Sequence, residues 1–206
     1  MNLDFLEIGT CNFNTLIQKA SDDTVGISVE PIKYYLDSIP NKKNVIKVNC
    51  AISPDDSEKV VEIYYIPEKV VQEKKLPGWI KGCSRIGSRH PAYDDLINEG
   101  KINLQTDIAI DKIKQIPISK LFEEHDVRSI KILKIDTEGS DCYILLNLEK
   151  YLLNKSQYHK PEKIIFESNH LTPKHLVDEV IHRYDKLGYE VVSRDINDTI
   201  LKRRIS

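Results

Sequence analysis

The sequence lacks the features that mark membrane proteins and zinc-binding domains. No apolar run approaches the ~20 residues that a membrane-spanning helix needs, so we expect no membrane association. The cysteines stand far apart, without the close pairs of a zinc site and without a secretory signal before them, at Cys11, Cys50, Cys83 and Cys142. We therefore expect reduced thiols and a cytoplasmic protein.

An excess of charge of one sign is missing as well. The chain has 30 basic and 32 acidic residues scattered along its length, which leaves a net charge of −2. Such a chain has no overall field to attract nucleic acid or an acidic membrane. We expect the partner to be a small molecule, including a glycan, and not a nucleic acid; the oligomeric state is left open.

The length of 206 residues suits one domain with one core. From about residue 67 to residue 103 the apolar periodicity fails, and prolines and glycines break up the segment. A long irregular segment in a compact domain is usually functional or mobile. The sequence therefore predicts a single domain over 1–206 with a substrate-binding or lid insertion at about 67–103.

Five apolar runs each end in polar residues or glycine. The clearest run covers 130–135 and continues into Asp136, Thr137, Glu138 and Gly139. The others cover 3–8, 25–29, 45–48 and 164–166 and lead into Gly9, Glu30, Asn49 and Glu167. A strand buried on both faces reads as a continuous apolar run, and ligands bind beyond the carboxyl ends of parallel strands. The runs predict five parallel strands whose ends line one edge of a sheet.

The carboxyl-terminal part predicts a change of strand direction. Thr172 and Pro173 open a helix with Thr172 as its cap, and this helix ends at Gly188. Two strand-like segments follow, 189–193 and 199–202, and the short turn between them makes them antiparallel. With strands and helices alternating before them, the fold class is α/β: a mostly parallel sheet closed by an antiparallel hairpin, which is the topology of class I methyltransferases.

Three motifs make the chain resemble the FkbM family of S-adenosylmethionine-dependent methyltransferases. They are Phe5-Leu6-Glu7-Ile8-Gly9-Thr10, Val29-Glu30-Pro31 and, the most specific, Lys134-Ile135-Asp136-Thr137-Glu138-Gly139. The resemblance implies a seven-stranded Rossmann-like sheet and methyl transfer, usually to a hydroxyl oxygen. In one respect the chain departs from the family, which commonly has a second glycine in the turn after the first strand, where Phe13 stands here.

The residues themselves agree with an adenosine-containing cofactor. Gly9 at a strand end lets backbone amides approach a ligand carboxylate, and Glu30 follows at the spacing where nucleotide-binding folds place an acid for ribose hydroxyls. Asn12 tolerates a positive φ, so the turn can form in spite of Phe13. The residues predicted to bind S-adenosylmethionine are Glu7, Gly9, Thr10, Asn12, Glu30, Cys50, Ala51 and Asp136.

Methyl transfer to a hydroxyl needs an aligned acceptor and a base that removes its proton. The predicted catalytic residues are Asp136, Glu167 and His170, although Asp136 can also serve only to cap the loop that follows it. The predicted substrate residues are Ser84, Arg85, His90 and Glu138. A solvated loop around Arg85 and a helix-end role for Glu138 are the simpler alternatives. Acidic strand ends can hold magnesium, but the ion needs few carboxylates, and no metal is predicted.

Three functions compete at this point. The first is a cytoplasmic O-methyltransferase that uses S-adenosylmethionine and acts on a hydroxyl of a sugar-containing or other small molecule. The second is a catalytically weak or inactive module that binds a nucleotide or S-adenosylmethionine together with a protein partner, which Phe13 favours. A nicotinamide-dependent dehydrogenase ranks third because such enzymes carry a fuller glycine fingerprint.

Overall fold

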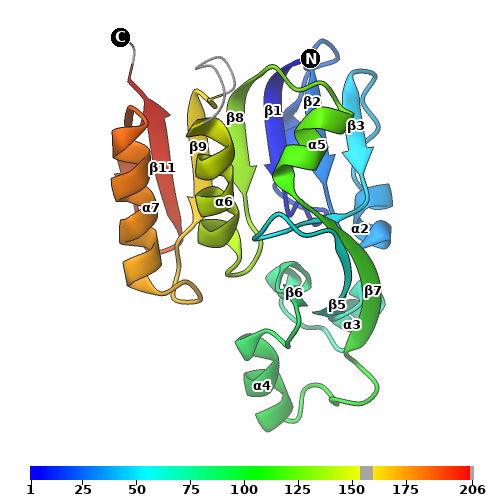
Figure 1. Cartoon of the computed structure of the whole chain (residues 1–206). Coiled ribbons are helices and arrows are strands. Elements are labelled where there is room, and N and C mark those ends of the chain that lie inside the picture. Colours follow the sequence, from blue (N-terminus) through cyan, green and yellow to red (C-terminus); the bar gives the residue numbers. More distant parts are fainter. Residues whose placement is uncertain (154–159, 205–206) are drawn as a thin grey trace. The chain divides into compact units, whose positions relative to one another are not determined.

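The computed structural model describes residues 1–153 and 160–204 (Figure 1). The chain divides into two compact units: residues 1–58 with 115–206, here called the main unit, and residues 59–114, here called the insert. Within the described ranges, no helix combines the length and the apolar character needed to cross a membrane.

The main unit contains a seven-stranded sheet with the strand order β10-β11-β9-β8-β1-β2-β3. Its strands are β1 (Asn2–Ile8), β2 (Gly26–Val29), β3 (Val45–Val48), β8 (Ser129–Ile135), β9 (Lys163–Glu167), β10 (Tyr189–Arg194) and β11 (Asp198–Arg203). The first five of these pair in parallel, whereas β11 runs antiparallel to both β9 and β10. The predicted mostly parallel sheet with an antiparallel carboxyl-terminal hairpin is confirmed.

The strand register brings the polar strand ends to one edge of this sheet. Ile8 at the end of β1 lies opposite Val29 of β2 and Ile135 of β8. Each of these residues precedes a member of the predicted polar edge, such as Glu30 after β2 and Asp136 after β8. Parallel strands that end in register therefore place the candidate residues side by side.

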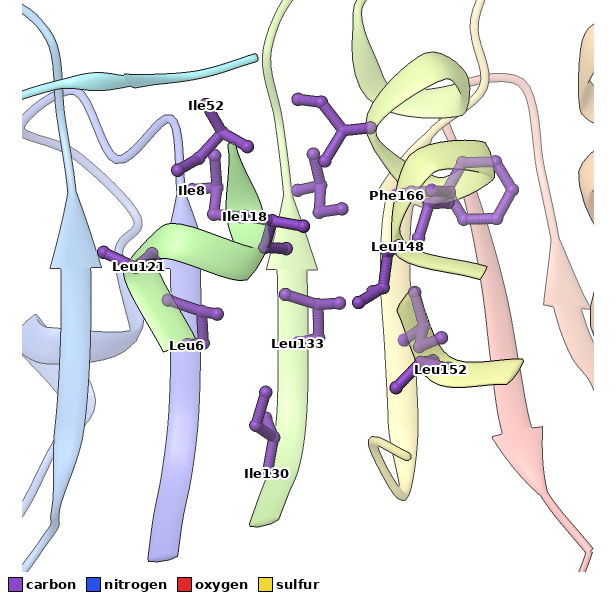
Figure 2. Close-up of a cluster of buried hydrophobic side chains, with 14 of the residues drawn as sticks. Leu6, Ile8, Ile52, Ile118, Leu121, Ile130, Leu133, Leu148, Leu152 and Phe166 are labelled. Carbon is purple, nitrogen blue, oxygen red and sulfur yellow. The ribbon is translucent and has the colours of Figure 1, made fainter. Parts of the chain in front are cut away.

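Helices cover both faces of the main sheet. They are α1 (Leu16–Lys19), α2 (Lys33–Ser38), α5 (Ile118–Glu124), α6 (Asp141–Leu153) and α7 (Lys174–Lys186). Figure 1 shows α5, α6 and α7 on the face toward the viewer, and Figure 2 shows Leu121 of α5 and Leu148 of α6 in one buried cluster with Leu6 and Leu133. On the opposite face, Phe5 packs in a cluster with residues of α1 and α2. Burial of this apolar surface is the main contribution to the stability of the unit.

The predicted cap of α7 is wrong. The cap position is taken by Pro173, whose carbonyl accepts the N–H of Leu176, and no side chain caps the helix. Thr172 is buried, and its Oγ1 has no hydrogen-bond partner among the described residues. Because its ring fixes φ near −65°, proline can itself set the direction in which the chain enters the helix.

The insert has regular structure of its own. Its elements are β5 (Lys59–Tyr65), α3 (Glu68–Glu73), the 3₁₀ helix η1 (Gly78–Gly82), β6 (Arg85–Ile86), α4 (Pro91–Asn98) and most of β7 (Ala109–Ile116). Strand β6 pairs antiparallel with β5, and the last two residues of β7, which belong to the main unit, pair with β4 (Ala51–Ile52). A separate core contains Ile66, Val71, Leu76, Ile80, Cys83, Tyr93, Leu96 and Ile102.

The expectation that 67–103 is irregular is therefore wrong. Each of its helices starts at a proline, with Pro67 and Pro77 as caps of α3 and η1 and Pro91 as the first residue of α4. These helices are only one to two turns long, so apolar residues cannot repeat often enough to show a helical period. The single-domain boundary and the role of 67–103 as a lid stay predictions.

Candidate functional site

Gly9 allows the ends of β1 and β8 to meet. Its φ is +79°, and a Cβ at this position would lie 1.8 Å from the carbonyl oxygen of Asp136. The Gly9 N–H donates to the carbonyl of Val29 at 3.0 Å, and the Asp136 N–H donates to the carbonyl of Ile8 at 2.9 Å. The glycine is thus required by backbone packing, and it places the loop that follows β1 directly beside Asp136.

Glu30 holds the start of that loop, which covers residues 9–15 and is called here the β1–α1 loop. The carboxylate of Glu30 is buried and accepts the N–H of Cys11 at 2.7 Å and the N–H of Ile32 at 2.9 Å. Burial raises the pKa of Glu30 to about 7. A carboxylate has about four acceptor positions, so a ribose hydroxyl could still donate to Glu30.

Glu7 holds the other end of the same loop. This side chain is 0% exposed, and its Oε2 accepts the N–H of Leu16, the first residue of α1, at 2.8 Å. Its Oε1 lies 3.3 Å from Nζ of Lys134, which in turn lies 3.4 Å from Oδ2 of Asp136. Burial raises the pKa of Glu7, and the charge of Lys134 opposes that shift. Glu7 is therefore held by groups of the protein itself, and its contact with the cofactor stays a prediction.

The loop between these two carboxylates contains three of the predicted cofactor residues, Gly9, Thr10 and Asn12. Thr10 is buried, and no described group bonds its Oγ1. Asn12 accepts a hydrogen bond from the side chain of Gln18 through its backbone carbonyl at 3.1 Å. After Gly9, the positive φ angles of the loop fall at Cys11 (45°) and Asn14 (54°) and not at Asn12. The turn forms without a second glycine, but the residues that adopt a positive φ in it do not include Asn12, where we expected one.

Cys50 and Ala51 lie in the segment that follows β3. Both are buried, and the amide of the preceding Asn49 donates to the carbonyls of Glu30 and Pro31, each at 2.9 Å. These bonds tie the end of β3 to the end of β2. The structure thus brings Gly9, Thr10, Glu30 and the Cys50 segment together at one edge of the sheet.

Three carboxylates meet at the ends of β8 and β9. Asp136, Glu138 and Glu167 each offer a carboxylate oxygen, and these oxygens lie within 4.8 Å of one another. Oxygen ligands of this kind suit a hard cation such as Mg²⁺. The trio joins two of the predicted catalytic residues, Asp136 and Glu167, with one predicted substrate residue, Glu138.

Glu167 is the most perturbed member of the trio. Burial, followed by the neighbouring carboxylates of Glu138, Asp141 and Asp136, raises its pKa to about 9. Its Oε1 accepts a hydrogen bond from the amide of Asn169 at 2.6 Å, while its buried Oε2 has no partner in the described part of the chain. Carboxyl groups with strongly raised pKa values are concentrated at functional sites.

Asp141 is a residue of this site that the sequence did not single out. It starts α6, is fully buried, and accepts hydrogen bonds from Oγ1 of Thr137 at 2.8 Å and from the N–H of Glu167 at 3.2 Å. Burial raises its pKa to about 7. Asp141 thus holds the loop after β8 against the end of β9. An acid four residues after Thr137, in the first turn of a helix, is the signal that could have identified it.

Asp198 also belongs to this edge. It stands opposite Glu167 in the register of β11 and β9, and burial, with the charge of Asp136, raises its pKa. The sequence indicated only a turn at this position. The pairing of β11 with β9 is what brings Asp198 to the acidic edge.

The remaining predicted residues have different surroundings. His170 is exposed in the segment between β9 and α7. Ser84, Arg85 and His90 belong to the insert, where Arg85 lies in β6 and the buried His90 caps α4 by accepting the N–H of Ala92 on Nδ1 at 3.1 Å.

The candidate site thus combines a glycine-containing turn, an acid after β2 and acidic ends of β8 and β9 on one seven-stranded sheet. A family model for the methyltransferase FkbM domain matches residues 7–191 of the 206-residue chain. The chain belongs to the FkbM methyltransferase family. Searches of curated proteins and of solved structures found no match.

Membership of the FkbM family confirms the predicted resemblance and the Rossmann-like methyltransferase fold. The matched range begins at Glu7 and ends in β10, so it contains every predicted site residue. For an FkbM methyltransferase the general reaction is methyl transfer, and hydride transfer to a nicotinamide is no longer a competing function.

Proposed function

We propose that this FkbM methyltransferase uses S-adenosylmethionine and methylates a hydroxyl oxygen of a sugar-containing or other small molecule. The observation that carries the proposal is the meeting of Asp136 and Glu167 at adjacent strand ends, beside the β1–α1 loop. A base at this place can take the acceptor proton, which an alcohol must lose to become a good nucleophile.

The residues around the β1–α1 loop fit the cofactor. The hydroxyl of Thr10 is buried without a partner among the described residues, as expected of a group that meets a ligand. Glu30 keeps free acceptor capacity for ribose hydroxyls, and Gly9, Asn12, Cys50 and Ala51 lie on the same loop or on neighbouring strand ends. S-adenosylmethionine supplies, when bound, a methyl group on a positively charged sulfur.

The roles of the chain's own residues follow from their surroundings. Asp136 accepts the proton of the acceptor hydroxyl and orients that hydroxyl. Glu167, whose raised pKa suits a proton carrier, assists from β9, and His170 is the exposed alternative. Glu138 is assigned to the acceptor. A cytoplasmic location stays part of this proposal.

Two measurements test the proposal. Calorimetric titration with S-adenosylmethionine should show binding, and labelled methyl transfer from the cofactor to a panel of glycans and small alcohols should identify an acceptor. With that acceptor, Asp136→Asn should lower turnover by roughly 10²-fold or more because the base is lost while the shape is kept. Cofactor affinity should survive. Normal turnover by the variant would show that Asp136 is not the base and would assign that role to Glu167 or His170.

One observation favours the second function, a binding module with weak or no catalysis and a protein partner. Both oxygens of Glu30 already accept backbone N–H groups, and Phe13, which stands in place of the family's glycine, is part of the same loop. Tight cofactor binding without methyl transfer to any member of the panel would support this alternative. If the protein binds no S-adenosylmethionine at all, the proposed methyltransferase activity is rejected.

A further inference from the structure

We infer that Lys134 is a positioning residue for the cofactor site, acting as the counter-ion of Glu7 and thereby fixing the β1–α1 loop. The inference rests on the proposed use of S-adenosylmethionine, because the loop carries Gly9, Thr10 and Asn12, which are assigned to that cofactor. Lys134 is not assigned to the cofactor or the acceptor, and its effect passes through another side chain.

The geometry beneath the loop supports this role. Nζ of Lys134 lies 3.3 Å from Oε1 of Glu7 and 3.4 Å from Oδ2 of Asp136, and the lysine side chain is only 20% exposed. Residues 7 and 134 stand opposite each other in the parallel pairing of β1 with β8. The ammonium group is therefore held between two carboxylates that come from two neighbouring strands.

Glu7 needs this partner because it is fully buried. A buried carboxylate without a counter-ion tends to take up a proton, and a protonated carboxyl accepts hydrogen bonds more weakly. Burial does raise the pKa of Glu7, while Lys134 lowers it. Burial alone would lower the pKa of Lys134, but Asp136 and Glu7 raise it, so the lysine keeps its charge.

The charge state of Glu7 affects the loop through its hydrogen bond with Leu16. The Glu7 carboxylate accepts the Leu16 N–H at 2.8 Å, where α1 begins, and the Glu30 carboxylate accepts the Cys11 N–H at 2.7 Å near the start of the loop. The loop is thus fixed at both ends by buried carboxylates. Of the two, only Glu7 is paired with a lysine in the interactions that the structure describes.

The test compares cofactor affinity in the full chain and its variants. Lys134→Met should weaken binding of S-adenosylmethionine roughly tenfold, the scale of one lost hydrogen bond to a charged group. Lys134→Arg, which keeps the charge, should restore most of the affinity. Lys131→Met is the matched control, because Lys131 also joins β8 to β1 through Asp4 at 2.7 Å but is 64% exposed. The affinity of the Lys131→Met variant for S-adenosylmethionine should be unchanged.

The same substitution made in a Glu7→Gln variant separates a positioning role of Lys134 from a general effect on stability. In Glu7→Gln the residue is neutral and can still accept the Leu16 N–H, so adding Lys134→Met should cause no further loss of affinity. This comparison also serves if Lys134→Met alone does not fold, since the double variant has no buried carboxylate at position 7 that would need a counter-ion. An equal loss in both backgrounds, or unchanged affinity in folded Lys134→Met, overturns the inference. Absence of binding by the unaltered protein overturns the proposed function and the inference with it.

Discussion

Several residues at the carboxyl edge of the sheet have structural roles that need no ligand. Gly9 is the clearest case, since a side chain there would overlap the Asp136 carbonyl. Glu7 and Glu30 likewise bind backbone N–H groups of the β1–α1 loop. The same residues that define the family motif thus build the turn that a cofactor would meet.

Gly9→Ala should be strongly destabilising. The new Cβ would be 1.8 Å from the Asp136 carbonyl oxygen in a backbone with φ +79°, so the ends of β1 and β8 must separate. We expect a loss of at least ~3 kcal/mol in the free energy of unfolding, measured by urea denaturation.

Gly188→Ala is the matched control in the same unit. Gly188 has φ +93°, but a Cβ added there would meet nothing within 4 Å, so only the backbone strain of about 1–2 kcal/mol applies. Equal losses in the two variants would show that the β1–β8 contact relaxes freely.

The sequence identifies those site residues that follow apolar runs, and it misses those that depend on pairing. Asp136 and Glu30 are visible because a run of apolar residues stops at each of them. Lys134 stands inside such a run, and its contact with Glu7 becomes evident only when the register of β1 and β8 is known. Asp198 reaches Glu167 in the same way, through a strand pairing that no local pattern encodes.

At the scale of elements, long periodic segments are predictable and short ones are not. The predicted strand at 130–135 is observed as β8, and the helix predicted from Pro173 to Gly188 is observed as α7, each within two residues. The helices of the insert have five to eight residues and begin at prolines, so they read as irregular chain. Their packing around a separate core, and not their own periodicity, makes them regular.

Tyr93→Ala should unfold the insert selectively. Tyr93 is 0% exposed within the core of the insert, and its hydroxyl donates to the Cys83 carbonyl at 2.5 Å. Loss of such an aromatic side chain lowers the free energy of unfolding by about 3–5 kcal/mol, a large fraction of what a core as small as that of the insert can provide.

Hydrogen exchange measures the outcome segment by segment. Protection should fall across 59–114 and persist in β1 and β8 of the main unit. Trp79→Ala is the control, because Trp79 lies in the same insert but is 56% exposed. Loss of protection in both units would mean that they unfold as one.

For the whole molecule, buried carboxyl groups make stability depend on pH. Burial raises the pKa of Glu30 from 4.5 to about 7 in the folded chain. Between these values the folded protein binds more protons than the unfolded one, so the free energy of unfolding falls as the pH rises. The contribution of Glu30 is fully present below pH 4.5 and is lost as the pH passes 7.

Urea unfolding between pH 4.5 and pH 7 tests this dependence. We expect Glu30 to contribute on the order of 3 kcal/mol to the decrease, and Glu30→Gln should remove that part of the slope. An unchanged slope in the variant would show that other groups, such as Asp141, account for the pH dependence.

The position of β11 has a consequence for how the chain is made. In the sheet β11 lies between β9 and β10, although it follows both of them in the sequence. During synthesis on the ribosome, β10 therefore cannot join the sheet beside β9 until residues 198–203 have emerged to pair with both strands. Until then β9 lacks its partner on that side, and the acidic edge is complete only when Asp198 pairs opposite Glu167. An enzyme assembled in this order gains its full set of site carboxylates only with its last strand.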